Sequence, residues 1–247
     1  MSIQLSQLLH RGSLLLAVMM CETGFVPVLH ANPATSVVEL FTSQGCSSCP
    51  PADHLLSSLA RDPTTVAVSF PIDYWDFMGW QDTLASPSFT ARQKAYASSH
   101  GSHVYTPQVV VDGLSDAVGS DKTQIEHAIK TNKGRDGALS VPIHMSESGD
   151  TLHIDVGAGA GGAASVFVLR VIRAKTVVIG RGENSGRSVT YTNVVRAIRK
   201  IGDWDGKARS YELSELKGDN EGYVVLLQKG SETNPGVILA ATKSSGF

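Results

Sequence analysis

The feature that most constrains this chain is a pair of cysteines separated by two serines, Cys46-Ser47-Ser48-Cys49. The pair follows a short β-type run at 37–41 and precedes Pro50-Pro51, after which apolar residues recur at helical spacing. Prolines are tolerated in the first turn of a helix, where the amide hydrogens have no helical partner. The sequence therefore predicts a strand, a loop and a helix whose N-terminus bears both sulfurs, close enough to form a disulfide or to remain a dithiol.

A cysteine pair in this position has a defined chemistry. The first turn of a helix presents free N–H groups and the positive end of the helix dipole, and both stabilise an anion. We therefore expect a lowered pKa for Cys46, whose thiolate would attack a partner disulfide while Cys49 resolves the mixed disulfide. Ser47 and Ser48 bring neither a charge nor an imidazole, so the helix terminus is the main expected source of thiolate stabilisation.

A second signal lies downstream, where Thr106-Pro107 precedes a strand at 109–111. A Thr-Pro in this place after a dithiol resembles the arrangement in thioredoxin-like proteins, where the proline is cis and packs beside the dithiol. A cis proline turns the backbone sharply and offers no N–H donor. We therefore predict a cis Thr106–Pro107 bond near the cysteines; an ordinary trans loop proline is the alternative.

The order of elements divides the chain. Residues 32–136 alternate as β-α-β, a helical insertion at about 73–104, and β-β-α, whereas residues 139–247 show mainly strand patterns of period two. The predicted fold class is an α/β thioredoxin-like domain at 32–136 followed by a mostly β, sandwich-like domain at 139–247. The glycine-rich run 157–162 is expected to be a hairpin loop, since no Lys-Ser or Lys-Thr follows it as in a phosphate-binding loop.

Residues 1–31 have the pattern of a secretory signal peptide. A weakly basic start ending at Arg11 is followed by the apolar run 14–20, and Ala31 offers a small-residue cleavage site. Cleavage near Ala31 would remove Cys21 and leave Cys46 and Cys49 as the remaining cysteines. We expect an exported protein; an uncleaved N-terminal anchor is the alternative.

The charge balance argues against one class of partner. Lys and Arg total 21, Asp and Glu total 23, and the sequence pI is about 6.4. A near-neutral chain lacks the basic footprint that nucleic-acid binding requires. We therefore expect no nucleic-acid partner.

Several runs together resemble the exported bacterial proteins of domain of unknown function 1223. They are 38–53 with the cysteine pair, 73–80 with its aromatic side chains, 105–108 around the proline, 181–187 and 193–196. This chain has Pro71-Ile72 before the aromatic run, where His-Val is common in that family. The resemblance covers nearly all of the chain after residue 31. It implies a thioredoxin-like domain with a β-rich C-terminal domain, a periplasmic or secreted location, and no established substrate.

Four further groups are candidates for a place around the dithiol. Glu39 could accept the proton of the resolving cysteine, as an acid on the preceding strand does in thioredoxin; its spacing of seven residues before Cys46 is one longer, which would reverse its face of the strand. His103 could join Cys46 and Cys49 in a Cu(I) site, since thiolates and imidazole suit copper. The aromatic side chains of 74–80 are expected mostly to pack the insertion against the core, and 181–187 to form a polar turn with possible ion pairs.

Three functions follow from these residues. The first is a thiol–disulfide oxidoreductase with Cys46, Cys49, Thr106, Pro107 and Glu39 at its site. It would need no bound organic cofactor, and its partners would be protein or small-molecule thiols and disulfides, with a possible membrane electron donor. The second is copper binding or delivery. The third is a binding protein in which Cys46–Cys49 is a structural disulfide, a reading favoured if the cysteines are buried.

Overall fold

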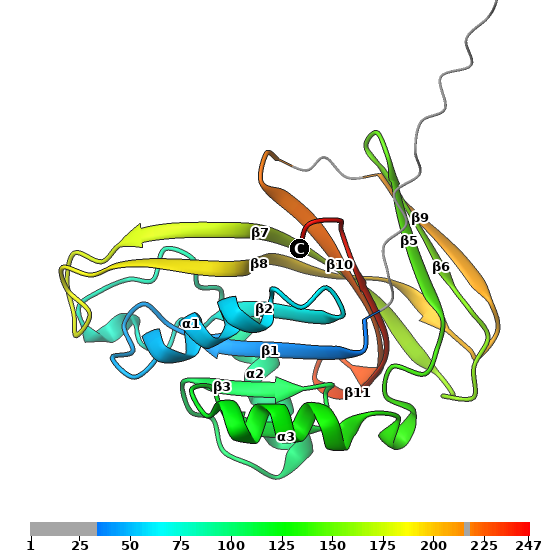
Figure 1. Cartoon of the computed structure of the whole chain (residues 1–247), viewed down its shortest axis with the longest axis horizontal. Helices are drawn as coiled ribbons and strands as arrows, with labels where there is room; N and C mark the ends of the chain where they lie inside the picture. Colours follow the sequence, from blue (N-terminus) through cyan, green and yellow to red (C-terminus); the bar gives the residue numbers. More distant parts are fainter. Residues whose placement is uncertain (1–33, 215–217) are drawn as a thin grey trace, which may run out of the picture.

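The computed structural model describes residues 34–214 and 218–247 (Figure 1). The predicted signal peptide at 1–31, with Cys21, lies outside the described residues. No helix in the described part of the chain is long and apolar enough to cross a membrane. The first elements are β1 (Ser36–Thr42), α1 (Pro50–Leu59), β2 (Thr65–Pro71), α2 (Pro87–His100), β3 (Gln108–Val111), β4 (Ser115–Val118) and α3 (Lys122–Asn132). The later ones are β5 (Ile143–Ser148), β6 (Thr151–Val156), β7 (Ala164–Val178), β8 (Ser188–Trp204), β9 (Arg209–Ser214), β10 (Glu221–Ser231) and β11 (Asn234–Lys243).

Strands from both halves of the chain form one mixed sheet. Its order is β11-β10-β7-β8-β2-β1-β3-β4, and the halves join where β2 pairs with β8 in parallel, Ser69 opposite Val194. The prediction of an α/β thioredoxin-like domain followed by a separate sandwich-like domain is therefore wrong. The fold is mostly β, with one eight-stranded sheet and three α-helices in the described residues. Local sequence patterns identified the strands. They do not specify which distant strand pairs with the exposed edge of β2, because that pairing depends on residues far apart in the sequence.

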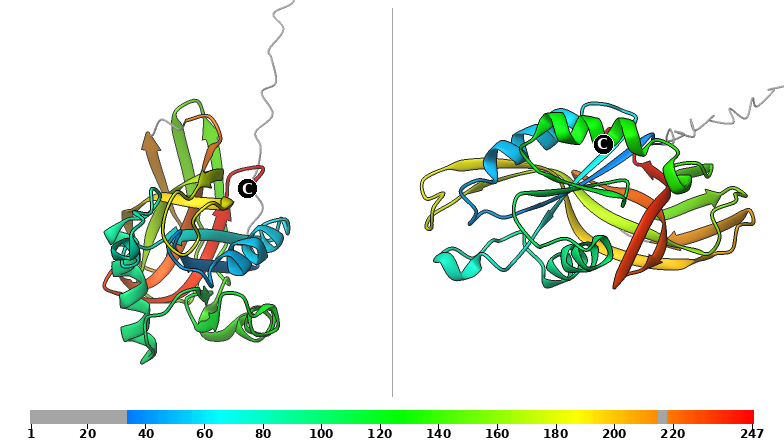
Figure 2. Two further views of the ribbon diagram at one scale, coloured as in Figure 1. Left: turned by 90° about the vertical axis from the view of Figure 1, so that its left-hand side faces the viewer. Right: turned by 90° about the horizontal axis from the view of Figure 1, so that it is seen from below.

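The N-terminal strands are buried on both faces, as strands covered by helices on two sides must be. Because side chains alternate along β1, Val38 and Leu40 pack in the cluster that includes α1 and α3. Val37 and Phe41 pack on the opposite face, in the cluster that includes α2. The view from below in Figure 2 shows this layering, with α1 and α3 on one side of the sheet and α2 on the other.

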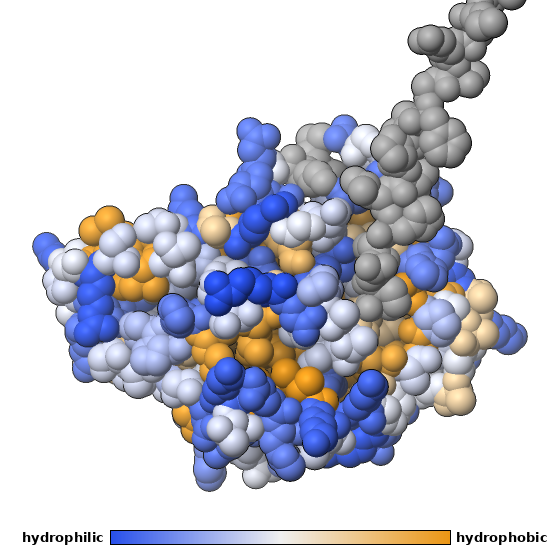
Figure 3. Space-filling model, viewed as in Figure 1, coloured by the Kyte–Doolittle hydropathy of each residue, from blue (hydrophilic) through white to orange (hydrophobic). Residues whose placement is uncertain are grey.

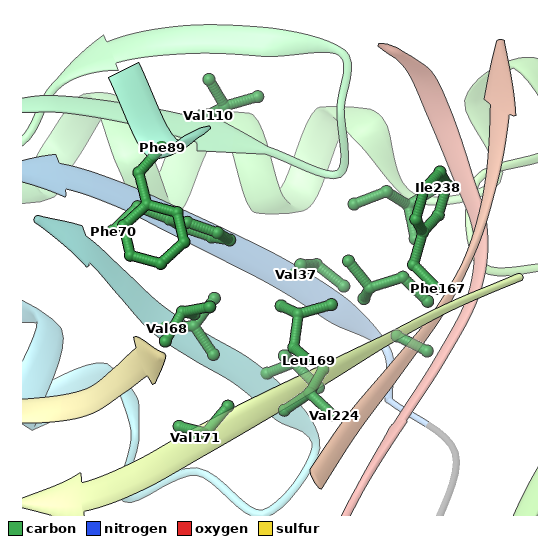
Figure 4. Packing of buried hydrophobic residues seen from close by; sticks show 14 of the residues in the cluster. Val37, Val68, Phe70, Phe89, Val110, Phe167, Leu169, Val171, Val224 and Ile238 are labelled. Carbon is green, nitrogen blue, oxygen red and sulfur yellow. The ribbon is translucent and has the colours of Figure 1, made fainter. Parts of the chain in front are cut away.

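The core on the α2 side continues across the join between the halves. Phe70 of β2 and Phe89 of α2 meet edge to face with ring centroids 5.3 Å apart. The same buried cluster includes Phe167 and Leu169 of β7 and Ile238 of β11 (Figure 4). Side chains from both halves of the chain therefore pack in one continuous core, just as strands from both halves share one sheet.

A small antiparallel sheet, β5-β6-β9, packs against the other face of the β7 end. Figure 1 shows it at the end of the molecule beyond the helices. The glycine-rich run 157–162 is a loop, but it connects β6 of the small sheet to β7 of the large sheet and so is not a hairpin. A Cβ at Gly161 would lie 2.5 Å from Leu239 Cδ1, so a larger residue there would force the Leu239 side chain of β11 to move.

Helix ends follow local sequence signals. Asp121 caps α3 by accepting a hydrogen bond from the Gln124 amide at 2.9 Å, and α2 ends at Gly101 in the left-handed conformation. On the α1–α3 side the core reaches the surface, where hydrophobic side chains gather between the two helices (Figure 3). The partly buried members of that cluster are Leu55, Leu59, Ala60 and Ile129.

Candidate functional site

Cys46 and Cys49 form a disulfide at the start of α1, with their Cα atoms 5.4 Å apart. Cys49 is the N-cap residue and accepts hydrogen bonds from the amides of Ala52 (2.9 Å) and Asp53 (3.1 Å). Both cysteines are completely buried, whereas Ser47 and Ser48 between them are exposed. The predicted position of the pair is confirmed, and the loop turns its serines rather than its sulfurs to solvent.

The helix terminus offers fewer donors than a free first turn usually has. Pro50 and Pro51 occupy its first two positions and have no amide hydrogen. A hydroxyl is within reach instead, because Cys46 Sγ and Ser48 Oγ are 3.4 Å apart. Ser48 was not singled out from the sequence, and it is the side chain placed to donate a hydrogen bond to a thiolate on Cys46.

The Thr106–Pro107 bond is cis, as predicted. Its loop lies beside the cysteines, since Ser48 Oγ is 3.5 Å from the Thr106 carbonyl oxygen, to which it donates. The Pro107 carbonyl accepts a hydrogen bond from the Gly119 amide at 2.9 Å. Gly119 permits this approach, because a Cβ there would lie 2.9 Å from Pro107 Cβ.

Trp75 joins the cysteine loop to the proline loop. Its indole N–H donates to Thr106 Oγ1 at 2.7 Å, and its Cβ lies 3.2 Å from where a Cβ would stand on Gly45. Trp75, Tyr74 and Trp80 are partly buried, whereas Phe77 is 80% exposed. The aromatic run therefore packs mainly against the body of the molecule, as expected, with Phe77 left at the surface.

The residues before Cys46 are held by a buried polar network. The Gln44 amide donates to Asp82 Oδ2, and Gln44 Oε1 accepts from the Trp80 indole, each at 2.8 Å. Asn184 Nδ2 donates to the carbonyl oxygens of Gln44 (3.0 Å) and Cys46 (2.8 Å). The segment 181–187, expected to be a polar turn, is such a turn, and its Asn184 is buried against the dithiol loop.

Glu39 is placed away from the disulfide. Its carboxylate accepts a hydrogen bond from Arg92 Nε at 2.9 Å and from the Tyr96 hydroxyl at 2.5 Å. Both partners belong to α2, and α2 covers the opposite face of β1 from α1. The sequence-predicted site residues Cys46, Cys49, Thr106 and Pro107 are thus brought together, and Glu39 is not.

The described residues do not bring His103 into a metal-binding cluster with the two cysteines. His103 is exposed, and no group of three or more His, Cys, Asp or Glu side chains is arranged to hold a metal ion in residues 34–214 and 218–247. Its neighbour His100 pairs instead with Asp116, at 2.9 Å between Nδ1 and Oδ1.

Asp53 is a carboxyl next to the dithiol that the sequence analysis did not assign. It lies one helical turn after Cys49, is 4% exposed, and accepts a hydrogen bond from Thr42 Oγ1 at 2.8 Å. Burial raises the pKa of Asp53 to about 8, against the lowering effect of the Thr42 hydrogen bond and with a further rise from the charge of Asp82. The spacing could have identified Asp53 from the sequence, because a residue four positions after Cys49 on a predicted helix lies on the same face as Cys49.

Comparison with known proteins places the chain in a family. No curated protein matches it. A crystal structure of a protein from Agrobacterium tumefaciens is similar, with 35% sequence identity and a TM-score of 0.78, over 87% of this chain and 96% of that one. HBP35 of Porphyromonas gingivalis is 13% identical with a TM-score of 0.60, over 86% of this chain and 75% of that one, and this likeness concerns the fold alone. The model of one family, described as protein of unknown function (DUF1223), matches residues 37–228. The chain therefore belongs to the DUF1223 family.

Proposed function

We propose that this protein is an exported thiol–disulfide oxidoreductase whose redox-active pair is Cys46 and Cys49. The observation that supports this most is the placement of the disulfide at the start of α1, with Ser48 in contact with both Cys46 and the Thr106–Pro107 loop. Two cysteines three residues apart at a helix start can interconvert between disulfide and dithiol with little movement of the backbone. The sulfurs themselves hold the electrons, so the proposal invokes no organic cofactor.

The exchange has two steps. In the reduced protein, the Cys46 thiolate attacks a sulfur of a partner disulfide, so that a Cys46–partner bond forms and the first partner thiolate leaves with the electron pair. Cys49 then loses its proton and attacks Cys46, which forms the Cys46–Cys49 bond and releases the second partner thiolate. The partner disulfide is reduced by two electrons and the protein dithiol is oxidised. The reverse sequence oxidises a partner dithiol.

The partners in this proposal are protein or small-molecule thiols and disulfides, and a membrane protein is a possible electron donor. The protein would act in the periplasm or outside the cell, where disulfides persist. Because both sulfurs are buried in this structure, a partner sulfur would reach Cys46 only after local opening of the loops around it.

The test is a trapping experiment with two matched single-cysteine variants. Reduced Cys49→Ser protein is mixed with oxidised glutathione, and we expect one glutathione per chain on Cys46, measured by intact mass. The Cys46→Ser variant should react at least tenfold more slowly, because Cys49 lacks the contact with Ser48. Equal rates in the two variants, or no adduct in either, would contradict the assigned order of attack.

A structural disulfide is the second candidate, and the complete burial of both cysteines is the observation that favours it. The reduction potential of the wild-type pair, equilibrated against glutathione or dithiothreitol buffers, separates the two. A value above about −270 mV would fit an exchange enzyme, whereas a value below about −300 mV is typical of structural disulfides.

A further inference from the structure

Cys49, the N-cap residue of α1, and Asp53 lie one turn apart at the start of the helix. The Asp53 amide donates to the Cys49 carbonyl at 3.1 Å, so Cys49 stands one helical turn before Asp53. Residues four apart in a helix lie one above the other, and helical side chains tilt toward the N-terminus. The Asp53 carboxyl is thus directed back toward the turn that begins with Cys49.

The Asp53 carboxyl is buried, and only one of its two oxygens has a hydrogen-bond partner in the described residues. Oδ1 accepts the Thr42 hydroxyl hydrogen bond, whereas Oδ2 has no hydrogen-bond partner in the described part of the chain. Leaving a buried polar atom without a partner costs folding stability. Among the buried, unpartnered side-chain atoms of residues 34–214 and 218–247, Asp53 Oδ2 is the one carboxyl oxygen, so it calls for a physical reason.

The surroundings of Asp53 raise its pKa to about 8, so the carboxyl is mostly protonated at pH 7 and becomes able to accept a proton as the pH rises through about 8. Burial is the largest cause of its raised pKa, and Asp82, from the segment before α2, adds a like charge. Tyr191 of β8 is a further ionisable group near Asp53 and Asp82, and its own pKa is raised by burial and then by these two carboxyls. With a pKa of about 8, Asp53 matches the ordinary thiol pKa of about 8.5 closely enough to exchange a proton with a cysteine efficiently.

We propose that Asp53 accepts the proton of Cys49 when this thiol attacks the mixed disulfide on Cys46, and returns it when the disulfide is reduced. The inference rests on the proposed function. In the resolving step the Cys49 proton moves to Asp53 Oδ2, the Cys46–Cys49 bond forms, and the bond from Cys46 to the partner sulfur breaks. The partner thiolate leaves with the electron pair, so Asp53 changes its charge while the sulfurs change their oxidation state.

The experiment uses the aromatic disulfide 5,5′-dithiobis(2-nitrobenzoate), which releases one coloured thiolate in each step. Reduced, desalted wild-type protein should give a first phase that depends on reagent concentration, from attack by Cys46. A second, concentration-independent phase should follow, from attack by Cys49. The isosteric variant Asp53→Asn should slow the second phase at least tenfold at pH 8 and leave the first within about twofold. The wild-type second phase should rise with pH through about 8, the pKa of Asp53.

Two further variants make this result specific. Asp112→Asn removes another buried carboxyl, whose pKa burial raises to about 6, from the opposite end of β1, and it should change neither phase. Thr42→Val keeps the acid but removes the hydrogen bond that lowers its pKa, so the inflection of the second phase should move to higher pH.

The outcomes separate this inference from the proposed function. Selective slowing of the second phase in Asp53→Asn, with an inflection that moves in Thr42→Val, supports the role of Asp53. If Asp53→Asn slows both phases equally or neither, Asp53 is not the proton acceptor and the oxidoreductase remains. If wild-type protein cannot be reduced by dithiothreitol, or gives no first phase, the proposed function fails and this inference with it.

Discussion

At the scale of single residues, Ser48 has the contact that distinguishes the two cysteines. Its hydroxyl lies 3.4 Å from Cys46 Sγ and 3.5 Å from the Thr106 carbonyl oxygen. In the oxidised protein it can donate to Thr106, and in the reduced protein it can donate to a thiolate on Cys46. A hydrogen bond to the charged form lowers a pKa, and the prolines at the helix start leave few amides to compete with it.

We predict that Ser48→Ala raises the pKa of the reduced Cys46 thiol by about one unit, the effect of losing one hydrogen bond to a charged group. The absorbance of the thiolate, followed as pH is raised, measures this. Ser47→Ala is the matched control, because Ser47 is also exposed and lies between the same two cysteines. A pKa that shifts equally in both variants would show that the Ser48 hydroxyl is not the specific donor.

At the scale of elements, α2 is tied to the sheet by a buried ion pair. Arg92 Nη2 lies 2.8 Å from Glu39 Oε1 of β1 and donates to Gln228 Oε1 of β10 at 2.9 Å. Arg92→Met leaves the Glu39 carboxylate buried without its cation, which should cost about 3–5 kcal/mol of unfolding free energy. Urea denaturation with linear extrapolation measures it.

The double variant Glu39→Gln with Arg92→Met removes both charges and should recover much of that loss. Glu39→Gln alone should leave both phases of the aromatic disulfide reaction unchanged, since the carboxylate faces α2. A slowed second phase in Glu39→Gln would restore Glu39 to the site, contrary to its position in the structure.

A second ion pair connects the end of α2 to the β3–β4 hairpin. His100 Nδ1 contacts Asp116 Oδ1 at 2.9 Å, and Asp116 also accepts a hydrogen bond from the Ser102 hydroxyl at 2.7 Å. The hydrogen bond with Asp116 raises the pKa of His100 above the ordinary histidine value of 6.5, against a lowering effect of partial burial. The stabilisation is therefore fully present below pH 6.5 and is lost as pH rises through the raised pKa.

We predict that His100→Gln lowers the melting temperature by roughly 2–4 °C at pH 5.5, the shift expected of about 1 kcal/mol in a chain of this size, and by less at pH 8.5. Thermal melts at the two pH values test this. His127→Gln on the exposed side of α3 is the control. An equal loss at both pH values would mean that packing, and not the proton on His100, provides the contact's stability.

At the scale of the whole molecule, the shared sheet predicts that both halves unfold together. Trp204 packs in the cluster near the small sheet, whereas Trp75 and Trp80 lie near the disulfide. Variants that keep fluorescence from one region, Trp204→Phe in one case and Trp75→Phe with Trp80→Phe in the other, should give coincident urea transitions after allowance for each variant's stability. Two separated transitions within one variant would indicate that the halves are independent.

The sequence predicted the local features of the site better than the long-range features of the fold. Cys46, Cys49 and the cis Pro107 follow from short patterns, because helix starts and proline bonds depend on neighbouring residues. The parallel pairing of Ser69 with Val194 has no such local signal, so the halves were wrongly expected to be separate. Asp53 is the last residue of the run 38–53, but its burial and unpartnered oxygen depend on tertiary packing.

The hydrogen bond from Asn184 to the Cys46 carbonyl has a consequence for synthesis of the chain. The two residues are 138 positions apart. A ribosome makes proteins from the N-terminus onward, so both cysteines exist for many seconds before Asn184 is added. During that interval the cysteine loop lacks this one hydrogen bond, although Asp82 and Trp80, which bind Gln44, are already present. A chain that ends before Asn184 therefore contains both cysteines without the contact that joins their loop to the second half of the molecule.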